Sequence, residues 1–586
     1  MLLAAIEICL TGLAIALAYI APNAGADGFE KIQKPFLSLA RRRWLAVLVV
    51  GLTALGARLA VLPVLPIPQP GIHDEFSHLL LADTIAHGRV ANNTHPMWIH
   101  FETFHVNQQP TYASMYYPGQ GSVLALGQVV FGHPFWGVWL SVGAMCAAIC
   151  WMLQAWVPSG WALLGGLLAV MRLATFSYWA NTYYGGAVAA IGGALVLGAL
   201  LRIKRRAHVG DALLMGLGLA ILANTRPYES LFFCTPVALV LFRWMFGRDA
   251  RALQLSIRRV VIPLALVLCV TMLGMGYYFW RVSGSPFRLP YQVNMTTYHM
   301  LYFPWQELKP DVEFHHPMLR EYYRGAPLAG TYHHARLHPL LWLSLKPLPQ
   351  IIFFLGPALM LPLLAWIAIR RRRSLARGIS RKAQFLLAVC GVTAIGLALP
   401  ICIPPAHYAA PLTAAIYALV VQAMRYMRLW HYKGQPSGLF LVRAVPVICF
   451  ALLPLRAVAS SLHIPVPVTV IHTWYSEDIQ NLDRARVLSQ LQREPGEQLV
   501  IVRYKTGHEV LDEWVYNGAD IDNSKVIWAR DMGAAKNEEL IRYFEHRRAW
   551  LLEPDEKPLR LSAYSFGSLP SGDTVAERKG QPKAGN

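Results

Sequence analysis

The stretch Val260–Trp280 reads VVIPLALVLCVTMLGMGYYFW, and none of its side chains carries a charge. Two further stretches, Ile351–Ile369 and Phe385–Ile403, are similarly apolar. A helix that crosses the hydrocarbon core of a bilayer needs about 20 predominantly apolar residues. The whole chain of 586 residues is 55% hydrophobic and only 15% charged, whereas soluble domains carry about 25% charged residues. The sequence therefore predicts an all-α polytopic membrane protein.

Basic clusters separate the apolar segments, and such clusters favour the cytoplasmic side of a membrane. The candidate spans, about 12 in number, are residues 1–20, 44–63, 134–155, 160–178, 184–203, 210–224, 230–246, 260–281, 349–370, 383–403, 408–427 and 438–460. The basic clusters lie at residues 41–43, 204–206, 248–259, 370–382 and 425–433. With every cluster on the cytoplasmic side the spans alternate without conflict, provided that the short apolar stretch 121–132 is an interfacial or re-entrant helix.

This alternation of spans and basic clusters divides the chain into three predicted parts. Residues 1–43 form an uncleaved first span and a basic cytoplasmic linker, and residues 44–460 form the transmembrane domain with outer loops 64–120 and 282–350. Residues 461–586 alternate short β-like runs with a helical stretch, which predicts a small extracytoplasmic α/β domain with a disordered end. We expect a multi-pass protein of the inner membrane whose outer loops and C-terminal domain face the periplasm.

Several classes of function are disfavoured. The net charge of +20 is explained by the cytoplasmic clusters, and no nucleic-acid-binding motif accompanies it. The eight cysteines all lie in or beside apolar segments, so they form no disulfide framework. The histidines of loop 282–350 lack the spacing of a zinc motif, so the sequence supports no metal or other cofactor. Motifs of ATP-driven pumps and of the commoner hydrolases are absent.

The first outer loop contains the candidate catalytic residues, the acidic pair Asp74 and Glu75. We expect a helix that begins near His73, ends at Gly88, and lies on the membrane surface through an apolar face. Asp74 then shares the polar face with Ser77 and His78, so His78 is a candidate substrate-binding residue. The alternative is a polar loop in which the acidic residues only cap a surface helix.

Polar and aromatic residues at the ends of other spans are further candidates for substrate binding. Arg226 and Glu229 occupy a tight turn between apolar helices, where charge is costly and usually functional. The alternative there is an internal ion pair that locks the turn. For the tyrosines among the remaining candidates, the alternative is an aromatic belt at the membrane interface. For His407 the alternative is a structural role. The remaining candidates are Tyr116, Tyr117, Tyr183, Tyr184, His407 and Tyr408.

Taken together, these features resemble the GT-C class of membrane glycosyltransferases, in the branch with the aminoarabinose transferase, protein O-mannosyltransferases and RgtA/B/C/D-like proteins. The resemblance rests on Asp74-Glu75, the helix after it, the Tyr-Pro-Gly-Gln entry to a short helix at Tyr117–Gln120, the many spans and the C-terminal tail. It covers roughly residues 44–430. A strict Asp-x-Asp motif is absent, which argues against a metal-dependent mechanism.

The resemblance implies inverting sugar transfer from a polyprenyl-phosphate donor to an extracytoplasmic lipid, glycan or protein. Such a reaction needs a carboxylate that takes a proton from the acceptor and a cation for the developing phosphate charge, roles that fit Asp74 and Arg226. The competing interpretations are a transporter or lipid flippase, and a membrane receptor with a periplasmic sensor tail.

Overall fold

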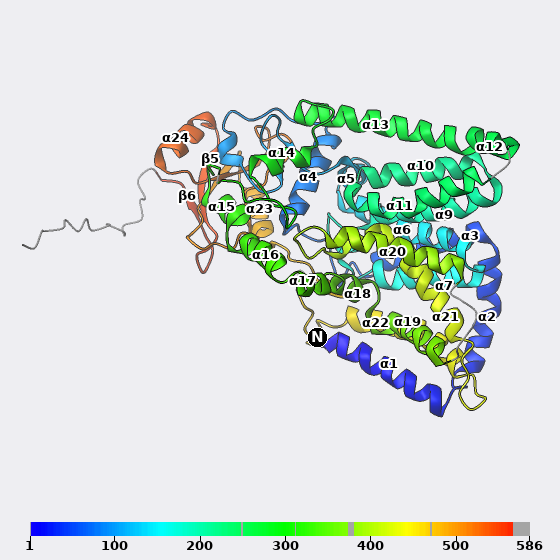
Figure 1. Ribbon diagram of the computed structural model, residues 1–586. Helices are drawn as coiled ribbons and strands as arrows, with labels where there is room; N and C mark the ends of the chain where they lie inside the picture. The colour runs from blue at the N-terminus through cyan, green and yellow to red at the C-terminus, as the bar shows by residue number, and fades with distance from the viewer. Residues whose placement is uncertain (1, 248–249, 311, 373–379, 469–471, 566–586) are drawn as a thin grey trace, which may run out of the picture.

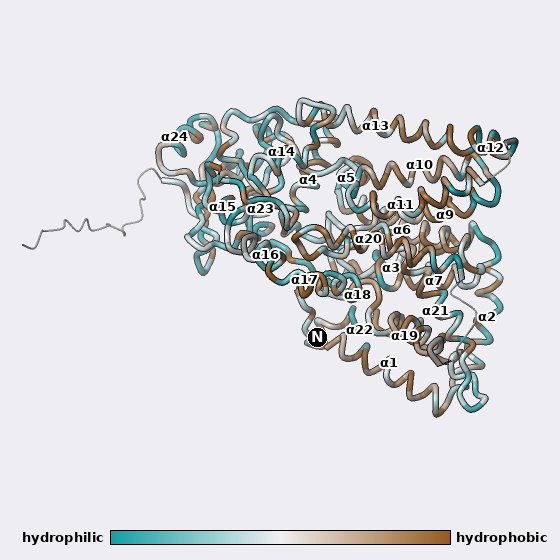
Figure 2. Tube along the Cα trace, in the orientation of Figure 1, coloured by the Kyte–Doolittle hydropathy of each residue, from teal (hydrophilic) through white to brown (hydrophobic). Residues whose placement is uncertain are grey.

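The computed structural model describes residues 2–247, 250–310, 312–372, 380–468 and 472–565. It has two parts, a bundle of long apolar helices and a polar lobe at one end of the bundle (Figures 1 and 2). The expected disordered end falls largely in residues 566–586, outside the described residues.

The bundle contains the predicted spans. Its helices are α1 (Leu2–Ile20), α3 (Arg43–Ala60), α6 (Phe135–Trp156), α7 (Ser159–Leu173), α9 (Ala187–Arg206), α10 (Val209–Ala223), α11 (Pro227–Phe246), α12 (Ala250–Ser256), the π-helical turn η2 (Ile257–Val261), α13 (Ile262–Ser283), α17 (Pro339–Leu345), α18 (Leu348–Phe354), α19 (Gly356–Arg372), α20 (Arg381–Ala398), the 3-10 helix η3 (Ala406–Leu412), α21 (Thr413–Met427) and α22 (Ser437–Ala457). An amphipathic helix, α2 (Ala26–Arg41), occupies the predicted basic linker.

Nine helices within the described residues are long and apolar enough to cross a membrane, and a bent pair makes up to ten. Two further predicted spans are the shorter apolar helices α7 and α10. The predicted span 349–370 is not one straight helix, because the chain bends by 110° between α18 and α19. Gly356 lies at that break with a φ of 56°, a conformation that L side chains avoid.

Loop 64–120 and the short helix after it lie between the bundle and the lobe. Their elements are α4 (His73–Ala86), the 3-10 helix η1 (Trp98–Phe101), strands β1 (Val106–Asn107) and β2 (Ala113–Ser114), and α5 (Pro118–Phe131). The chain begins α4 at His73 and turns through Gly88, whose φ is 70°, as expected. Helix α4 does not rest on a membrane surface, however, because both its apolar residue Phe76 and its polar residue His78 are buried by protein.

The C-terminal domain is a four-stranded sheet of order β4-β3-β5-β6 flanked by two helices. Its elements are α23 (Leu482–Arg493), β3 (Gln498–Val502), β4 (Val526–Arg530), α24 (Ala534–Tyr543), β5 (Arg548–Glu553) and β6 (Arg560–Ala563). Strand β3 pairs in parallel with β4 and β5, and β5 pairs antiparallel with β6. The sequence predicted short strands and a helical stretch in this domain.

One face of this sheet shares its core with loop 64–120. Leu499 and Ile527 of the sheet pack with Phe76, Phe101 and Tyr112 of the loop. Helices α14 (Pro290–Thr297), α15 (Pro317–Arg324) and α16 (Ala326–Leu337) of loop 282–350 complete the lobe (Figure 1). The outer loops and the C-terminal domain therefore form a single folded cover over one end of the bundle.

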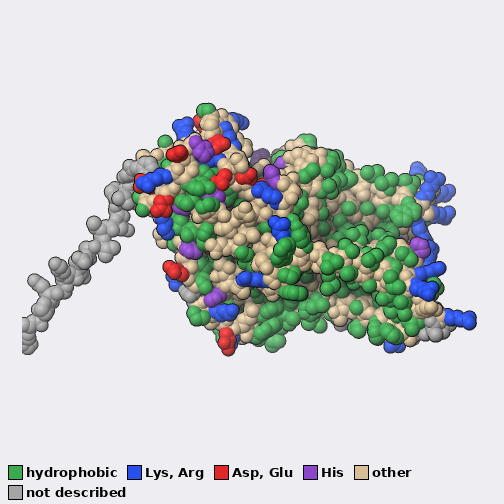
Figure 3. All heavy atoms as spheres, turned by 90° about the horizontal axis from the view of Figure 1, so that it is seen from above, with side chains coloured by type: hydrophobic (Ala, Val, Ile, Leu, Met, Phe, Trp, Pro, Cys, Tyr) green, Lys and Arg blue, Asp and Glu red, His purple; other side chains and the backbone are tan. Residues whose placement is uncertain are grey.

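The opposite end of the bundle is basic. Lys and Arg side chains gather at that end, away from the lobe (Figure 3). This segregation agrees with the alternation of charge predicted from the sequence.

Candidate active site

Four segments meet where the lobe covers the bundle. They are the first turn of α4 with Asp74, the segment after β2 with Tyr116, the turn between α10 and α11 with Arg226, and η3 with Tyr408. The backbone N–H of Gly119 donates to the carbonyl of Asn224 at 2.8 Å, which joins the second and third segments. Most of the candidate residues from the sequence lie at or near this junction.

Asp74 is held by a short chain of hydrogen bonds. The Tyr116 hydroxyl donates to Oδ1 of Asp74, and His105 Nδ1 lies 3.1 Å from the same hydroxyl oxygen. His105 Nε2 lies 3.1 Å from the Tyr322 hydroxyl. A neutral His105 with its proton on Nδ1 satisfies every member of this chain, with Tyr322 donating to Nε2.

The second carboxylate oxygen of Asp74 accepts no hydrogen bond from the described residues, and the side chain keeps 34% of its exposure. Desolvation by burial raises the pKa of Asp74, but His105, the Tyr116 hydrogen bond and His78 oppose it, and the net pKa lies below the ordinary value. Asp74 is therefore an ionised carboxylate at neutral pH with one oxygen available to a ligand.

Glu75 is placed differently from its neighbour. Its Oε2 accepts the N–H of Gly71 at 2.8 Å, and its Oε1 accepts the N–H of Tyr183 at 3.0 Å. Only 1% of the residue is exposed. Burial and the nearby Asp478 raise the pKa of Glu75 above its ordinary value. Glu75 thus ties the start of α4 to the segment before α9, and both of its oxygens are occupied.

His78 is buried and stacks on the Tyr116 ring, with centroids 4.4 Å apart. Burial lowers the pKa of His78 to about 3, so its ring is neutral at pH 7. The sequence also predicts that a protonated His78 next to Asp74 keeps that carboxylate ionised, and this prediction is wrong at neutral pH, where the His78 ring is neutral. Among the causes of the lowered pKa of Asp74, the Tyr116 hydrogen bond does not depend on the charge of a histidine, and the permanent charge of Arg226 also interacts with Asp74.

Arg226 precedes α11, and its guanidinium lies over the Tyr408 ring at 4.5 Å. Within the part of the chain that the structure describes, this guanidinium forms no hydrogen bond and no ion pair below 4.0 Å. Glu229, one turn further along α11, is buried and interacts with Arg226 only at longer range. The five N–H donors of Arg226 are therefore available to an anion.

The other candidate residues have structural partners. His407 Nδ1 lies 3.0 Å from the Tyr178 hydroxyl. Tyr183 donates to the Pro68 carbonyl at 2.9 Å, and the Tyr184 hydroxyl donates to Asp478. Tyr117 lies against Phe279 of α13, with ring centroids 6.2 Å apart. The tyrosines at 183 and 184 hold loop 64–120 and the linker before α23 onto the bundle rather than pointing at Asp74.

Sequence reasoning missed His105 and Tyr322. His105 has a φ of 58°, the left-handed conformation that is uncommon for residues other than glycine. Its carbonyl accepts the Ser77 hydroxyl at 2.7 Å, which fixes the ring beside Asp74. Neither residue stands in a recognisable motif, and loop 282–350 supplies Tyr322 across more than two hundred positions.

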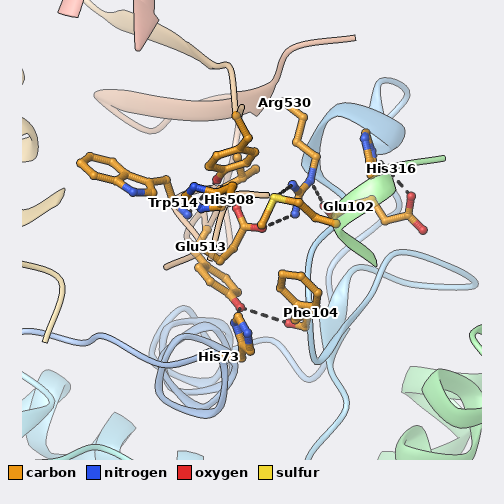
Figure 4. Close-up of polar contacts among 12 residues, drawn as sticks. His73, Glu102, Phe104, His316, His508, Glu513, Trp514 and Arg530 are labelled. Atoms are coloured by element: carbon orange, nitrogen blue, oxygen red, sulfur yellow. Dashed lines mark hydrogen bonds and ion pairs between the residues drawn. The ribbon is translucent and has the colours of Figure 1, made fainter. Parts of the chain in front are cut away.

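Behind the site, a buried polar network joins the loops to the C-terminal domain (Figure 4). Arg530 of β4 pairs with Glu513 and donates to the Glu102 carbonyl at 2.6 Å. His315 Nδ1 lies 2.9 Å from the Glu102 carboxylate. His73 Nδ1 lies 2.9 Å from the Tyr516 hydroxyl. This network holds both sides of the Asp74 hydrogen-bond chain in place.

An apolar groove lies beside the site. It has a volume of about 340 Å³, and its walls include Pro118, Asn224, Met275 and Tyr278. The Tyr278 hydroxyl donates to the Tyr116 carbonyl at 3.1 Å, so the groove adjoins the segment that holds Asp74. Among the described residues, no group of three or more His, Cys, Asp or Glu side chains is arranged to hold a metal ion.

No family model and no curated protein matches the sequence. Among solved structures, the chain is similar to the oligosaccharyltransferase of Archaeoglobus fulgidus tethered with an acceptor peptide, with a TM-score of 0.45 and 11% identity over 87% of this chain and 68% of that one. The archaeal oligosaccharyltransferase AglB from the same organism, in complex with an inhibitory peptide and a dolichol-phosphate, gives 0.43 and 11% over 88% and 70%. ArnT from Cupriavidus metallidurans gives 0.39 and 14% over 90% and 93%.

Because these TM-scores lie at 0.45 or below and the identities are 11–14%, both the fold and the chemistry of this protein rest on its own residues.

Proposed function

We propose that this chain is a membrane glycosyltransferase that moves a sugar from a polyprenyl-phosphate donor to an extracytoplasmic acceptor with inversion at the anomeric carbon. One observation carries the proposal. Among the described residues, one carboxylate oxygen of Asp74 accepts no hydrogen bond and the Arg226 guanidinium has no acceptor, and the two charges interact at one site. A general base and an anion-binding cation are the two groups that such a transfer requires.

The reaction assigned to this site is a single displacement. Asp74 accepts the proton of the acceptor nucleophile, whose electron pair attacks the anomeric carbon opposite the phosphate. The bond from that carbon to the phosphate oxygen breaks, and the phosphate leaves with the bonding electrons and an additional negative charge. Arg226 stabilises that charge through its N–H donors. Backside attack inverts the anomeric configuration and leaves Asp74 protonated.

The apolar groove supports a lipid-linked donor. Its wall residue Asn224 lies two positions before Arg226, and its wall residue Pro118 lies two positions after Tyr116. Helix α13, which forms another wall, belongs to a span that is only 6% buried within the protein. We assign the first isoprene units to this groove, so that the phosphate reaches Arg226 while the rest of the tail remains in the bilayer.

The sidedness follows from the charge. Because the basic end of the bundle lies away from the lobe, we assign that end to the cytoplasm and the site to the periplasm. The acceptor, a lipid, glycan or protein, then approaches from the lobe.

A reconstitution experiment separates this function from that of a flippase. Purified protein in nanodiscs is supplied with polyprenyl-phosphate sugars and candidate acceptors, and glycosylated product and freed polyprenyl phosphate are measured. We expect both products to form in equal amounts. Lipid translocation cannot be measured in a nanodisc, because a nanodisc has no enclosed compartment, so it is measured in sealed vesicles. Translocation there without any glycosylated product would establish the flippase instead.

A further inference from the structure

The basic end of the bundle contains a second cavity, of about 850 Å³, remote from Asp74. It lies between the ends of α3, α6, α9 and α10, with α13 beside them. Its walls bring together four arginines and one aspartate, namely Arg43, Arg202, Arg205, Arg206 and Asp211. A volume of this size is typical of small-molecule sites, which range over roughly 300–1,000 Å³.

Two of the arginines are fixed in position. Arg202 donates to the carbonyls of Gly198 and Trp151 at 2.9 and 2.8 Å, and its guanidinium lies 3.8 Å from the centre of the Trp151 ring. Arg205 donates to the Ala155 carbonyl at 2.9 Å. Charges that only orient a protein in the membrane need no such fixation. These bonds hold the guanidinium groups beside the cavity, and most of their N–H donors form no hydrogen bond with another described residue.

The cavity also has an apolar side. Leu213 and Leu217 of α10 line it and are 41% and 48% exposed. Trp44 at the start of α3 lines it as well and is 76% exposed. Basic groups beside exposed apolar side chains at a membrane boundary match a ligand with an anionic head and a hydrocarbon tail.

We propose that this cavity binds an anionic phospholipid, with its phosphate on the arginines and its acyl chains along Leu213 and Leu217. A soluble phosphate would use the arginines but would gain nothing from the leucines. The site is independent of the proposed glycosyl transfer, because its residues lie at the opposite end of the bundle from Arg226.

Native mass spectrometry of the full chain, released from detergent with phosphatidylglycerol or phosphatidylcholine, tests the proposal. We expect a one-to-one adduct with phosphatidylglycerol and a much weaker one with phosphatidylcholine. The double variant R205Q/R206Q removes two cations, each worth about 1 kcal/mol toward an anionic lipid. It should bind phosphatidylglycerol about thirtyfold more weakly, by the conversion of about 1.4 kcal/mol per tenfold.

The matched control is K31Q/K34Q, which removes two exposed cations of α2 outside the cavity. This control should bind phosphatidylglycerol as the wild type does. Equal weakening in both double variants, or equal wild-type adducts with the two lipids, would overturn the proposal. Displacement of the lipid by millimolar inorganic phosphate would assign the cavity to a soluble anion instead. The comparison of lipids uses only wild-type protein, so it remains decisive if R205Q/R206Q does not fold.

Discussion

Replacement of Arg226 tests whether this residue binds the donor phosphate. Its guanidinium has no hydrogen-bond acceptor among the described residues and lies on the Tyr408 ring at 4.5 Å. A hydrogen bond to a charged group contributes about 1.5–3 kcal/mol net. Because the side chain is partly exposed, we take the lower value for each bond of a bidentate pair, about 3 kcal/mol together.

Arg226→Ala should therefore lower kcat/KM about a hundredfold, at about 1.36 kcal/mol per tenfold. Arg226→Lys keeps the charge but loses the forked geometry and the stacking on Tyr408, so we expect a loss of about tenfold. The assay is transfer from a polyprenyl-phosphate sugar by purified protein whose elution profile matches that of the wild type. If Arg226 only balanced Glu229, the double variant Arg226→Ala/Glu229→Ala would recover activity, and such recovery would remove Arg226 from the site.

Three further predictions concern the proton chain, the topology and the lobe. Tyr116→Phe removes a hydrogen bond that lowers the pKa of Asp74, so that pKa should rise and the acid limb of the pH–rate profile should move to higher pH. The control Tyr112→Phe, whose hydroxyl donates to the Asn517 carbonyl instead, should leave the limb in place. Single cysteines introduced at the exposed positions Glu313 and Glu509 should be labelled by an impermeant reagent in intact cells, whereas a cysteine at Lys31 should be labelled only after permeabilisation. The reverse pattern would show that the topology is opposite to the one assigned. Arg530→Ala leaves the fully buried Glu513 carboxylate without its cation, so the free energy of unfolding in detergent should fall by about 3–5 kcal/mol. The control Arg542→Ala breaks an exposed pair and should lower it by about 0.5 kcal/mol or less. Equal losses would contradict the role of the network.

Much of the bundle could be predicted from the sequence because span length and charge segregation act locally. Every predicted span contains a helix. The predicted span 349–370 is interrupted near Gly356, where the sequence predicted a single helix. The partners of the few charged residues inside the spans could not be predicted. Glu7 of α1 and Arg172 of α7 form a buried ion pair, and Arg58 of α3 is buried as well. Such pairs depend on which helices become neighbours, and hydropathy carries no information about that.

The site was only partly predictable for the same reason. Asp74 and Arg226 could be singled out, because charged residues at the ends of apolar spans are costly unless they have a role. Helix position favoured Asp74 over Glu75, because Asp74 shares the polar face with Ser77 and His78. The structure adds that the Glu75 oxygens accept the N–H groups of Gly71 and Tyr183, which the helix alone could not predict. His105 and Tyr322 reach Asp74 through loop packing, and the shared core of loop 64–120 with β3 and β4 brings that loop into place.

The most direct measurement compares Asp74→Asn with Glu75→Gln in sugar transfer from a polyprenyl-phosphate donor, alongside donor binding and thermal unfolding. Asp74→Asn keeps the size of the side chain and removes the proton acceptor, so we expect transfer to fall by about a hundred- to ten-thousandfold with donor binding and stability nearly unchanged. Glu75→Gln should instead lower stability, because it disturbs the N–H groups of Gly71 and Tyr183, while the remaining folded protein keeps turning over. Loss of turnover in Glu75→Gln with normal turnover in Asp74→Asn would move the base to Glu75, and normal turnover in both would refute a carboxylate base at this site.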